Sequence, residues 1–478
     1  MSGPNAGPST AVHQTLDQGL RHLASLGGDL VDYANSIGSI LWSPPRVVIV
    51  GRLKAGKSTL VNALIGAPVA ETAALEATNV VTIYSDGSPS RADVVGIDGR
   101  RYPVAVHRDE RVHLPIDSPD VAFVDRWLPS AALRNLTLID TPGLSTLTVA
   151  NDAATRRVTI DGFEQTRTAS IDADAAIFLF DAAPRRDELD FLAQLPFTPL
   201  NTLGVLSRAD AFGEGALGRR DPLGHAAEHA TRLSAQLAGT VEDVVPISGL
   251  MAQTSHTGML TEQLAAQLAS LQAMSPLDVT LMFDDDAVDG SLMPAVRDRL
   301  LGLLGEYGVI NGRRVATGGA AALNRWLVDR SGIATLHRAL DASTTRYAVL
   351  HRAHRILDRL DRLAFTHPAR EQIRSLTAQL RATPSLHPVT VFEDYQRMLR
   401  TDPKAAVTDE LRTVLTATSP AGRVGLPDQA PTHAVMAEAQ RRLAMAHQRA
   451  LATGSAAEDA AIVTLIRTYT PLSAPPAR

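Results

Sequence analysis

A glycine-rich segment near residue 50 carries the side chains that could bind a phosphate chain. Residues 51–58, Gly-Arg-Leu-Lys-Ala-Gly-Lys-Ser, fit the pattern G-x-x-x-x-G-K-[ST] in full. Its glycines let the backbone wrap a phosphate with successive N–H groups pointing inward and a helix N-terminus behind. Lys57 would place a point charge on the β- and γ-phosphates, and Ser58 would offer a hydroxyl ligand to Mg²⁺. The residues expected to bind nucleotide here are Gly51, Lys54, Ala55, Gly56, Lys57, Ser58 and Thr59.

The lysine content supports this interpretation over a glycine-rich turn that binds nothing. Only Lys54, Lys57 and Lys404 are lysines among the 46 basic residues, and all the others are arginine. Such a bias is typical of a GC-rich genome, in which arginine replaces lysine wherever the chemistry allows. A turn without chemistry would not resist this drift, yet two of the three lysines lie in the loop.

A second group of candidates follows a predicted strand at 136–139. Asp140 begins the segment Asp-Thr-Pro-Gly, where an acid can hold Mg²⁺ through water and the Gly143 amide can sense the γ-phosphate. A threonine in the preceding loop can ligate Mg²⁺ only when triphosphate is bound, which makes that loop a switch. We expect Thr78 in this role and keep Thr82 as the alternative, and either threonine could instead be only a strand residue. Lys54, Lys57, Thr78 and Gly143 are therefore the catalytic candidates, and Ser58, Thr78 and Asp140 are the metal ligands.

The choice of base is predicted from the segment that follows the apolar run at 203–206. GTPases usually carry Asn or Thr, then Lys, any residue and Asp at this place, and residues 207–210 read Ser-Arg-Ala-Asp. Asp210 would accept hydrogen bonds from guanine N1 and N2, a pattern that adenine cannot match. Arg208 can lay its stem along the base as lysine does, while Ser207 departs from the usual residue. Ser248 and Gly249 fit the last guanine loop, in which a backbone amide meets O6.

The elements that would position these residues indicate an α/β fold. Short apolar runs at 46–50, 136–139, 175–180, 203–206 and 244–247 read as buried strands, and helical stretches separate most of them. Alternating strands and helices predict a doubly wound, mainly parallel sheet. A helical pattern spans residues 9–41 with a break at Gly27 and Gly28, and helices without strands follow from residue 343, ending in a loose tail from Pro471.

Length and composition restrict the remaining possibilities. The 478 residues predict two or three domains, and 45% apolar with 20% charged residues is a globular composition. Cysteine is absent, which excludes disulfides, cysteine nucleophiles and thiolate metal sites. A net charge of −5 gives no basic field for nucleic acid, so no nucleic-acid partner is expected. With no run of eighteen apolar residues and no signal peptide at the N-terminus, a cytoplasmic protein is expected.

The motifs together resemble those of bacterial dynamin-like proteins and, within these, of the isoniazid-inducible IniC-type GTPases of mycobacteria. The similar segments are 51–66, 76–78, 140–143, 207–210 and 244–250, with weaker similarity through the helical remainder. The resemblance implies a P-loop GTPase head on an α-helical neck or stalk bundle formed by N- and C-terminal helices. The expected domains are a helical segment at 1–44, a dynamin-type GTPase domain at 45–342, and a helical neck or stalk at 343–478.

Two functions remain open at this point. The resemblance implies Mg²⁺-dependent hydrolysis of GTP to GDP, coupled to self-association and membrane remodelling at the inner face of the plasma membrane. It also implies a homo-oligomer, or association with a longer paralogous dynamin-like protein. The alternative is a soluble switch GTPase whose helical part binds a protein or ribosomal target. The sequence has no polybasic cluster beside an aromatic tip, and only 4% of its residues are aromatic, so the residues alone argue poorly for a membrane.

Lys54 carries a separate hypothesis. It lies three residues before Lys57, where dynamins commonly have serine beside a bound monovalent cation and guanylate-binding proteins have an arginine finger. A lysine there could supply, within one chain, the positive charge that offsets charge developing during phosphoryl transfer. The alternative is a solvent-facing lysine that only tethers the nucleotide.

Overall fold

Two compact units make up the computed structural model. It describes residues 8–52, 54–70, 80–107, 110, 112–144, 164–284, 292–452 and 454–475. The first unit, Pro44–Thr344, is called the head here. The second unit, called the bundle, combines Met1–Ser43 with Thr345–Arg478.

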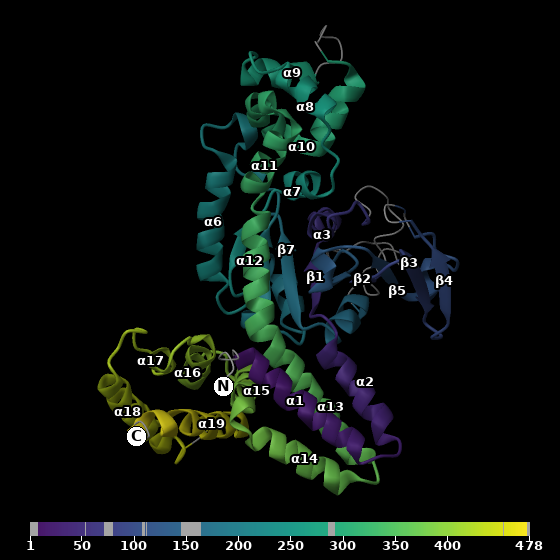
Figure 1. The fold of residues 1–478 in the computed structure, drawn as a ribbon. Coiled ribbons are helices and arrows are strands. Elements are labelled where there is room, and N and C mark those ends of the chain that lie inside the picture. Colours follow the sequence, from purple (N-terminus) through teal and green to yellow (C-terminus); the bar gives the residue numbers. More distant parts are fainter. Residues whose placement is uncertain are drawn as a thin grey trace, which may run out of the picture. The chain divides into compact units, whose positions relative to one another are not determined.

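In the described part of the head, nine strands form one sheet in the order β4-β3-β5-β2-β6-β1-β7-β8-β9 (Figure 1). Strand β1 pairs in parallel with β6 and β7, and β8 and β9 continue the parallel half. The strands of this half are β1 (Arg46–Gly51), β6 (Thr137–Asp140), β7 (Ala175–Phe180), β8 (Thr202–Leu206) and β9 (Val244–Pro246). Each of the five coincides, within a residue or two at its ends, with an apolar run predicted to be a strand. The predicted α/β class with a mainly parallel sheet is confirmed.

The other half of the sheet was not predicted. Strand β2 pairs antiparallel to β6 and parallel to β5, while β3 pairs antiparallel to both β5 and β4. These strands are β2 (Thr82–Asp86), β3 (Arg91–Gly96), β4 (Arg101–Ala105) and β5 (Val121–Leu128). They enclose a small valine-rich core of their own. The sheet is therefore mixed, with an extension that begins next to β6.

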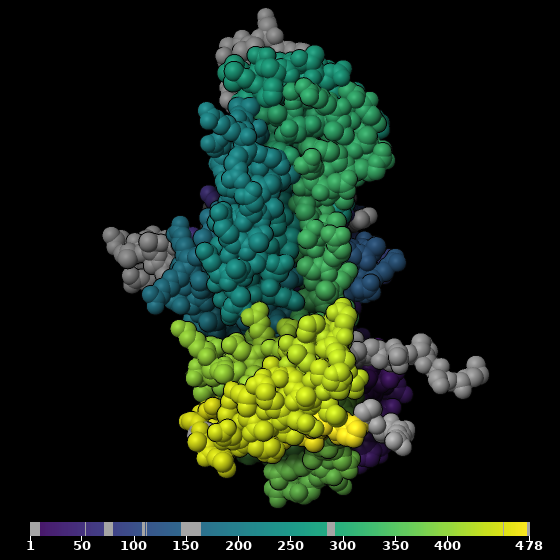
Figure 2. Space-filling view, turned by 90° about the vertical axis from the view of Figure 1, so that its left-hand side faces the viewer, coloured from purple at the N-terminus to yellow at the C-terminus, as the bar shows by residue number. Residues whose placement is uncertain are grey.

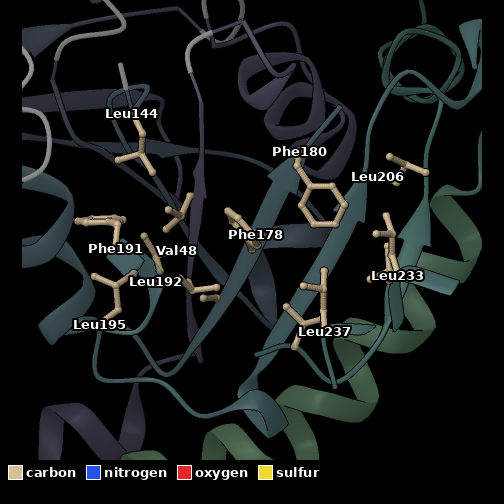
Figure 3. Packing of buried hydrophobic residues seen from close by; sticks show 14 of the residues in the cluster. Val48, Leu144, Phe178, Phe180, Phe191, Leu192, Leu195, Leu206, Leu233 and Leu237 are labelled. Atoms are coloured by element: carbon tan, nitrogen blue, oxygen red, sulfur yellow. The ribbon is translucent and has the colours of Figure 1, made fainter. Parts of the chain in front are cut away.

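Helices cover the parallel half, and a large apolar cluster fills one of its faces. The covering helices include α3 (Lys57–Ile65), α5 (Arg186–Leu192) and α6 (Pro222–Gln236). Figure 3 shows Phe178 and Phe180 of β7 lying between the leucines near α5 and those around the end of α6. On the side that carries α6, teal and green atoms, the colours of α6 and of α10–α12, form the surface of the head (Figure 2). This packing holds the parallel strands, and therefore their carboxyl ends, in place.

Helices α7–α11 form a helical subdomain inside the head, after β9. They enclose a second apolar core that includes Met251, Leu268, Leu304 and Leu323. Their bounds are α7 (Gly249–His256), α8 (Glu262–Ala269), α9 (Pro276–Asp284), α10 (Pro294–Val315) and α11 (Gly319–Ser331), and α12 (Ile333–Ser343) follows. Helix α10 is broken at Gly305, whose φ of 65° and ψ of 174° are not helical. The break lies beside Asp210, a residue of the candidate nucleotide site.

The bundle is formed by helices from both ends of the chain, as predicted. Helices α1 and α2 pack against each other and against α13, and α1 also contacts α14. The predicted break between the first two helices is confirmed, since Gly27 and Gly28 have φ values of 78° and 63°. The bundle helices are α1 (Pro8–Ser25), α2 (Leu30–Trp42), α13 (Val349–Thr366), α14 (Arg370–Ala382), α15 (His387–Thr401), α16 (Ala406–Thr416), α17 (Pro420–Arg423), α18 (Thr432–Arg449) and α19 (Ala456–Ser473).

The loose tail expected from Pro471 is wrong, because α19 continues to Ser473 with Pro471 inside its last turn. Buried contacts hold this helix: Thr464 donates to Asp394 of α15 at 2.6 Å, and Thr468 lies 2.8 Å from His387 Nε2. Tertiary packing of this kind outweighs the one backbone hydrogen bond that a proline near a helix end removes. In the described part of the chain, no helix combines the length and the apolar character needed to cross a membrane.

Candidate nucleotide-binding site

The phosphate loop begins where β1 ends, and its shape depends on glycine at the first position. Gly51 pairs with Leu179 of β7, and a Cβ atom on Gly51 would lie 2.4 Å from the Leu179 carbonyl oxygen. Gly56, the residue before α3, has a φ of 97°, which glycine adopts readily. Lys54 also has a positive φ, 64°, which is uncommon for a residue with a side chain. Such backbone strain is typical of functional loops.

Lys57 lies inside this loop. Its side chain is buried, and Nζ donates to the carbonyl oxygens of Gly51 and Arg52, each at 2.9 Å. Burial lowers the pKa of Lys57 to about 8, against the opposing effect of the Asp140 carboxylate. A buried ammonium of this kind is stabilised when an anion comes within reach.

Asp140, at the end of β6, is the other buried charge of the site. It pairs with Ile49 of β1, so it lies close to the start of the loop. Burial raises the pKa of Asp140 to about 6, although the Lys57 ammonium and the Thr141 N–H both act to lower it. Within the described residues, its buried Oδ1 has no hydrogen-bond partner.

This unpartnered oxygen provides the test of whether the site fits Mg²⁺. A buried carboxylate oxygen without a partner is costly, and a hydrated Mg²⁺ ion would satisfy it. Carboxylate and hydroxyl oxygens, with water, are the ligands that Mg²⁺ takes beside phosphates. Ser58, in the first turn of α3, adds the hydroxyl. The described residues therefore fit this ion.

The segment after Asp140 is tied to the phosphate loop by two hydrogen bonds. Thr141 Oγ1 donates to the Ile49 carbonyl at 2.7 Å, and the Leu144 N–H donates to the Gly51 carbonyl at 3.1 Å. Gly143 lies between these two anchors, beside the start of the loop. The predicted γ-phosphate sensor is thus held near the phosphate loop by its neighbours.

Of the two threonines considered as switch ligands, only Thr82 belongs to the described part of the chain. Thr78 lies outside the described residues. Thr82 is the first residue of β2 and faces Asp140 directly across the antiparallel β2–β6 pair. Opposed residues in such a pair project from the same face of the sheet, so Thr82 shares a face with Asp140.

At the base end of the site, Arg208 contacts the phosphate loop. The Arg208 guanidinium donates to the Lys54 carbonyl oxygen at 2.8 Å, and Arg208 itself has a φ of 55°. Ser207, the residue that departs from the usual GTPase pattern, is buried and donates to the Phe180 carbonyl at 3.2 Å. Serine therefore links β8 to β7 at this position, and Arg208 links the base end to the phosphate end.

Asp210 lies beside the last guanine loop, as expected from the order of the motifs. Burial raises the pKa of Asp210, and a hydrogen bond with the Ser248 side chain acts against that shift. Ser248 is fully buried, and it caps α7 by accepting from the Met251 N–H at 3.4 Å. A Cβ atom on Gly249 would lie 3.4 Å from Thr59 Cγ2, so this loop also lies against α3. The fold thus brings Asp210, Ser248, Gly249 and Thr59 together.

Two residues near the site were not found from the sequence. The Asn62 side chain of α3 makes two hydrogen bonds with the backbone of Ala70. Its Nδ2 donates to the Ala70 carbonyl at 3.0 Å, and the Ala70 N–H donates to its Oδ1 at 2.6 Å. An asparagine within the apolar run Leu60–Ile65 was the available signal. Gly305, which lies beside Asp210, is the second residue. The only signal in the sequence was a glycine that interrupts an apolar helical pattern.

Comparison with known proteins agrees with this geometry. A family model described as 50S ribosome-binding GTPase matches residues 46–197. Isoniazid-induced protein IniC of Mycobacterium tuberculosis (strain CDC 1551 / Oshkosh) is 31% identical over 452 residues, which cover 88% of this chain and 89% of that protein. Isoniazid-induced protein IniA of the same strain is 36% identical over 130 residues, 25% of this chain and 20% of that protein.

Among solved structures, the chain is similar to an oligomerised bacterial dynamin pair described as sensing and tethering membranes at long range. The TM-score is 0.33 at 14% identity, and the match covers 97% of this chain and 60% of that one. The chain thus spans less than two thirds of the length of that structure, and a TM-score of this size does not establish a common fold.

The α/β head with its phosphate loop, together with the family model that matches it, defines a P-loop GTPase. The match to IniC extends well beyond the head, over most of both chains. The chain belongs to the family of the isoniazid-induced protein IniC, and the resemblance predicted from its motifs is confirmed.

Proposed function

We propose that this GTPase hydrolyses GTP with Mg²⁺ and couples the nucleotide cycle to self-association and to membrane remodelling at the inner face of the plasma membrane. The observation that carries the catalytic part is the buried pair at the phosphate end. The Lys57 ammonium is desolvated, and Asp140 Oδ1 has no hydrogen-bond partner among the described residues. Phosphates would neutralise the first, and hydrated Mg²⁺ would satisfy the second, so both groups are prepared for Mg·GTP.

The residue roles in this proposal are those expected from the sequence motifs. Lys57 and the loop N–H groups bind the β- and γ-phosphates, and Ser58 and Asp140 hold Mg²⁺, which would neutralise charge on the phosphates during transfer. Gly143 senses the γ-phosphate, and Thr78 completes the metal site when triphosphate is bound. Asp210, Arg208 and the Ser248-Gly249 loop bind guanine.

Self-association and membrane action rest on the family and on the architecture. The head is proposed to act as a dynamin-type GTPase domain and the bundle as its neck or stalk, since the bundle combines helices from both ends of the chain. A longer paralogous protein similar to IniA, which is 36% identical to this chain over 130 residues, is a candidate partner.

Two measurements test this proposal. Specific GTPase activity should rise with protein concentration, because association of heads would complete or stabilise the site, and flotation with liposomes should increase with a non-hydrolysable GTP analogue. Lys57→Ala is the matched control, since it removes nucleotide binding and should abolish both responses. An activity that stays flat over a wide concentration range would contradict self-activation.

The alternative is a switch GTPase that binds a protein or ribosomal target without membrane action. The description of the matching family model, which names ribosome binding, is the observation that favours it. In that case liposome flotation would be absent with every nucleotide, whereas co-sedimentation with ribosomes would depend on GTP. Liposome flotation and ribosome co-sedimentation therefore distinguish the two functions, since each predicts binding in one assay and none in the other.

A further inference from the structure

The break in α10 places the helical subdomain against the base end of the nucleotide site. Gly305 has a φ of 65° and a ψ of 174°, a combination that only glycine adopts without strain. The break turns the chain so that Gly305, Glu306 and Tyr307 lie along the segment that follows β8. That segment carries Asp210 and leads into α6.

Each of these three residues lies near a different part of that segment. A Cβ atom on Gly305 would lie 3.2 Å from Asp210 Oδ2. Glu306 Oε2 lies 4.0 Å from the position that a Cβ atom would take on Gly215. Tyr307 forms a side-chain hydrogen bond with Asp221, the residue that caps α6. One short piece of α10 therefore runs beside the base-binding segment, and the Tyr307 hydrogen bond ties the two together.

The broken part of α10 is itself held rigidly by the helical subdomain. Thr254 Oγ1 of α7 donates to the Leu303 carbonyl at 2.5 Å. The Tyr307 ring stacks on Trp326 of α11, with centroids 6.2 Å apart and planes 8° from parallel. Leu304 is completely buried in the core of the subdomain. These contacts of its neighbours hold the Gly305 backbone in place beside Asp210.

We infer that Gly305 is a positioning residue for base selection: its bare backbone lets the Asp210 carboxylate lie where it can accept from both N1–H and the 2-amino group of guanine. This inference rests on the proposed function and adds to it a specificity element outside the nucleotide motifs. A side chain at residue 305 would press on Oδ2, because 3.2 Å is closer than an ordinary contact between a carbon and an oxygen. The carboxylate would then turn away from the base.

Gly305→Ala tests this inference with a readout that a merely structural role would not change. Inosine triphosphate lacks the 2-amino group, so the ratio of GTP to ITP affinity reports on the contact with Asp210. We expect Gly305→Ala to weaken GTP binding about 5-fold, a part of what a hydrogen bond to a charged group contributes. The same substitution should weaken ITP binding less, because inosine keeps N1–H but has no 2-amino group to lose, so the ratio falls toward one.

Gly258→Ala is the matched control. Gly258 also has a positive φ, 69°, and belongs to the segment after α7, but no atom of the described residues lies within 4 Å of its would-be Cβ. Gly258→Ala therefore adds a methyl group at another glycine with positive φ without touching Asp210, and its GTP to ITP ratio should equal that of the parent. A parent-like ratio in folded Gly305→Ala would overturn the inference.

Tyr307→Phe extends the test if Gly305→Ala does not fold. It removes the hydroxyl held by Asp221 and should lower the GTP to ITP ratio in the same direction by a smaller factor, whereas an unchanged ratio would count against the inference. Failure of the proposed function gives a different result, since the parent itself would then fail to prefer GTP over ATP.

Discussion

The phosphate end and the base end of the nucleotide site draw on different parts of the head. At the phosphate end, Lys57 begins the helix after β1 and Asp140 ends the neighbouring strand β6. Lys57 is held by a hydrogen bond within the loop, and Thr141, next to Asp140, by one to β1. At the base end, Asp210 forms a hydrogen bond with Ser248 after β9 and lies beside Gly305 of the helical subdomain. Arg208 joins the two ends through its bond to the Lys54 carbonyl.

This difference indicates which functions can be separated by mutation. Changes at the phosphate end should reduce binding or catalysis for every purine triphosphate, because no base contact is involved. Changes at the base end should alter selectivity first and leave the chemistry of phosphoryl transfer intact. The predictions below test that separation, beginning with the largest expected effect.

Lys57→Ala should remove most nucleotide binding. Two charge-assisted hydrogen bonds to phosphate, each contributing about 1.5–3 kcal/mol, would be lost, which corresponds to roughly 10²- to 10⁴-fold in affinity. Titration with fluorescent GTP and ATP analogues should show the same proportional loss for both. Lys404→Ala, which removes an exposed lysine of the bundle, is the control and should bind as the parent does. A loss confined to GTP would contradict the separation of the two ends.

Lys54→Ala should lower kcat by about 10²-fold while affinity changes little. An arginine finger supplies on the order of 10³-fold or more, and lysine offers a point charge without the bidentate fork. The side chain is exposed on the loop, and Arg208 binds the Lys54 backbone carbonyl, so the substitution removes the ammonium without removing that hydrogen bond. Single-turnover hydrolysis measures this rate directly, and Lys54→Arg should retain most of it. If Lys54→Ala weakens binding but hydrolyses bound GTP at the parent rate, the lysine only tethers nucleotide.

Asp210→Asn should weaken GTP binding by about 10-fold, since a carboxylate acceptor is exchanged for an amide. The same variant should gain affinity for xanthosine triphosphate, whose acceptor and donor pattern is reversed at the position that Asp210 faces. Competition binding with the two nucleotides measures this exchange, and hydrolysis of saturating nucleotide should continue at a rate near that of the parent. Equal loss for both nucleotides would indicate damage to the fold instead of altered recognition.

Arg208→Ala should have the smallest effect, about 3-fold in affinity, because it removes one exposed hydrogen bond to a backbone carbonyl. GTP and ATP should both be affected, since Arg208 supports the phosphate loop as well as the base end. Arg208→Lys, which restores the usual GTPase residue, should recover most of the loss. A change in GTP binding alone would show that the residue acts only on the base.

The fold could be predicted from sequence only where strands are covered on both faces. Strands β7 and β8 are buried along their whole length, so they appear as continuous apolar runs. In β4, exposed residues alternate with half-buried ones, and Arg101 and Pro103 interrupt any apolar pattern. The extension that includes β2–β5 was missed for this physical reason.

The candidate site shows the same limit. The phosphate loop is contiguous in sequence, and its glycines and Lys57 are required by local geometry, so the motif with the strand before it and the helix after it predicts the loop. Gly305 and Asn62 act through partners distant in the chain or outside any motif, and the sequence does not reveal which groups they meet. Ser207 was noted as a departure from the GTPase pattern, but only the structure shows its bond to the Phe180 carbonyl.

The measurement that tests the central claim most directly is titration of the purified protein with GTP and ATP, each in the presence of Mg²⁺ and of a chelator. The account predicts a clear preference for GTP, because Asp210 selects guanine, and a large loss of affinity without Mg²⁺, because Asp140 Oδ1 and the phosphates then lack their shared cation. Equal affinity for GTP and ATP, unaffected by the chelator, would contradict the assignments at both ends of the site.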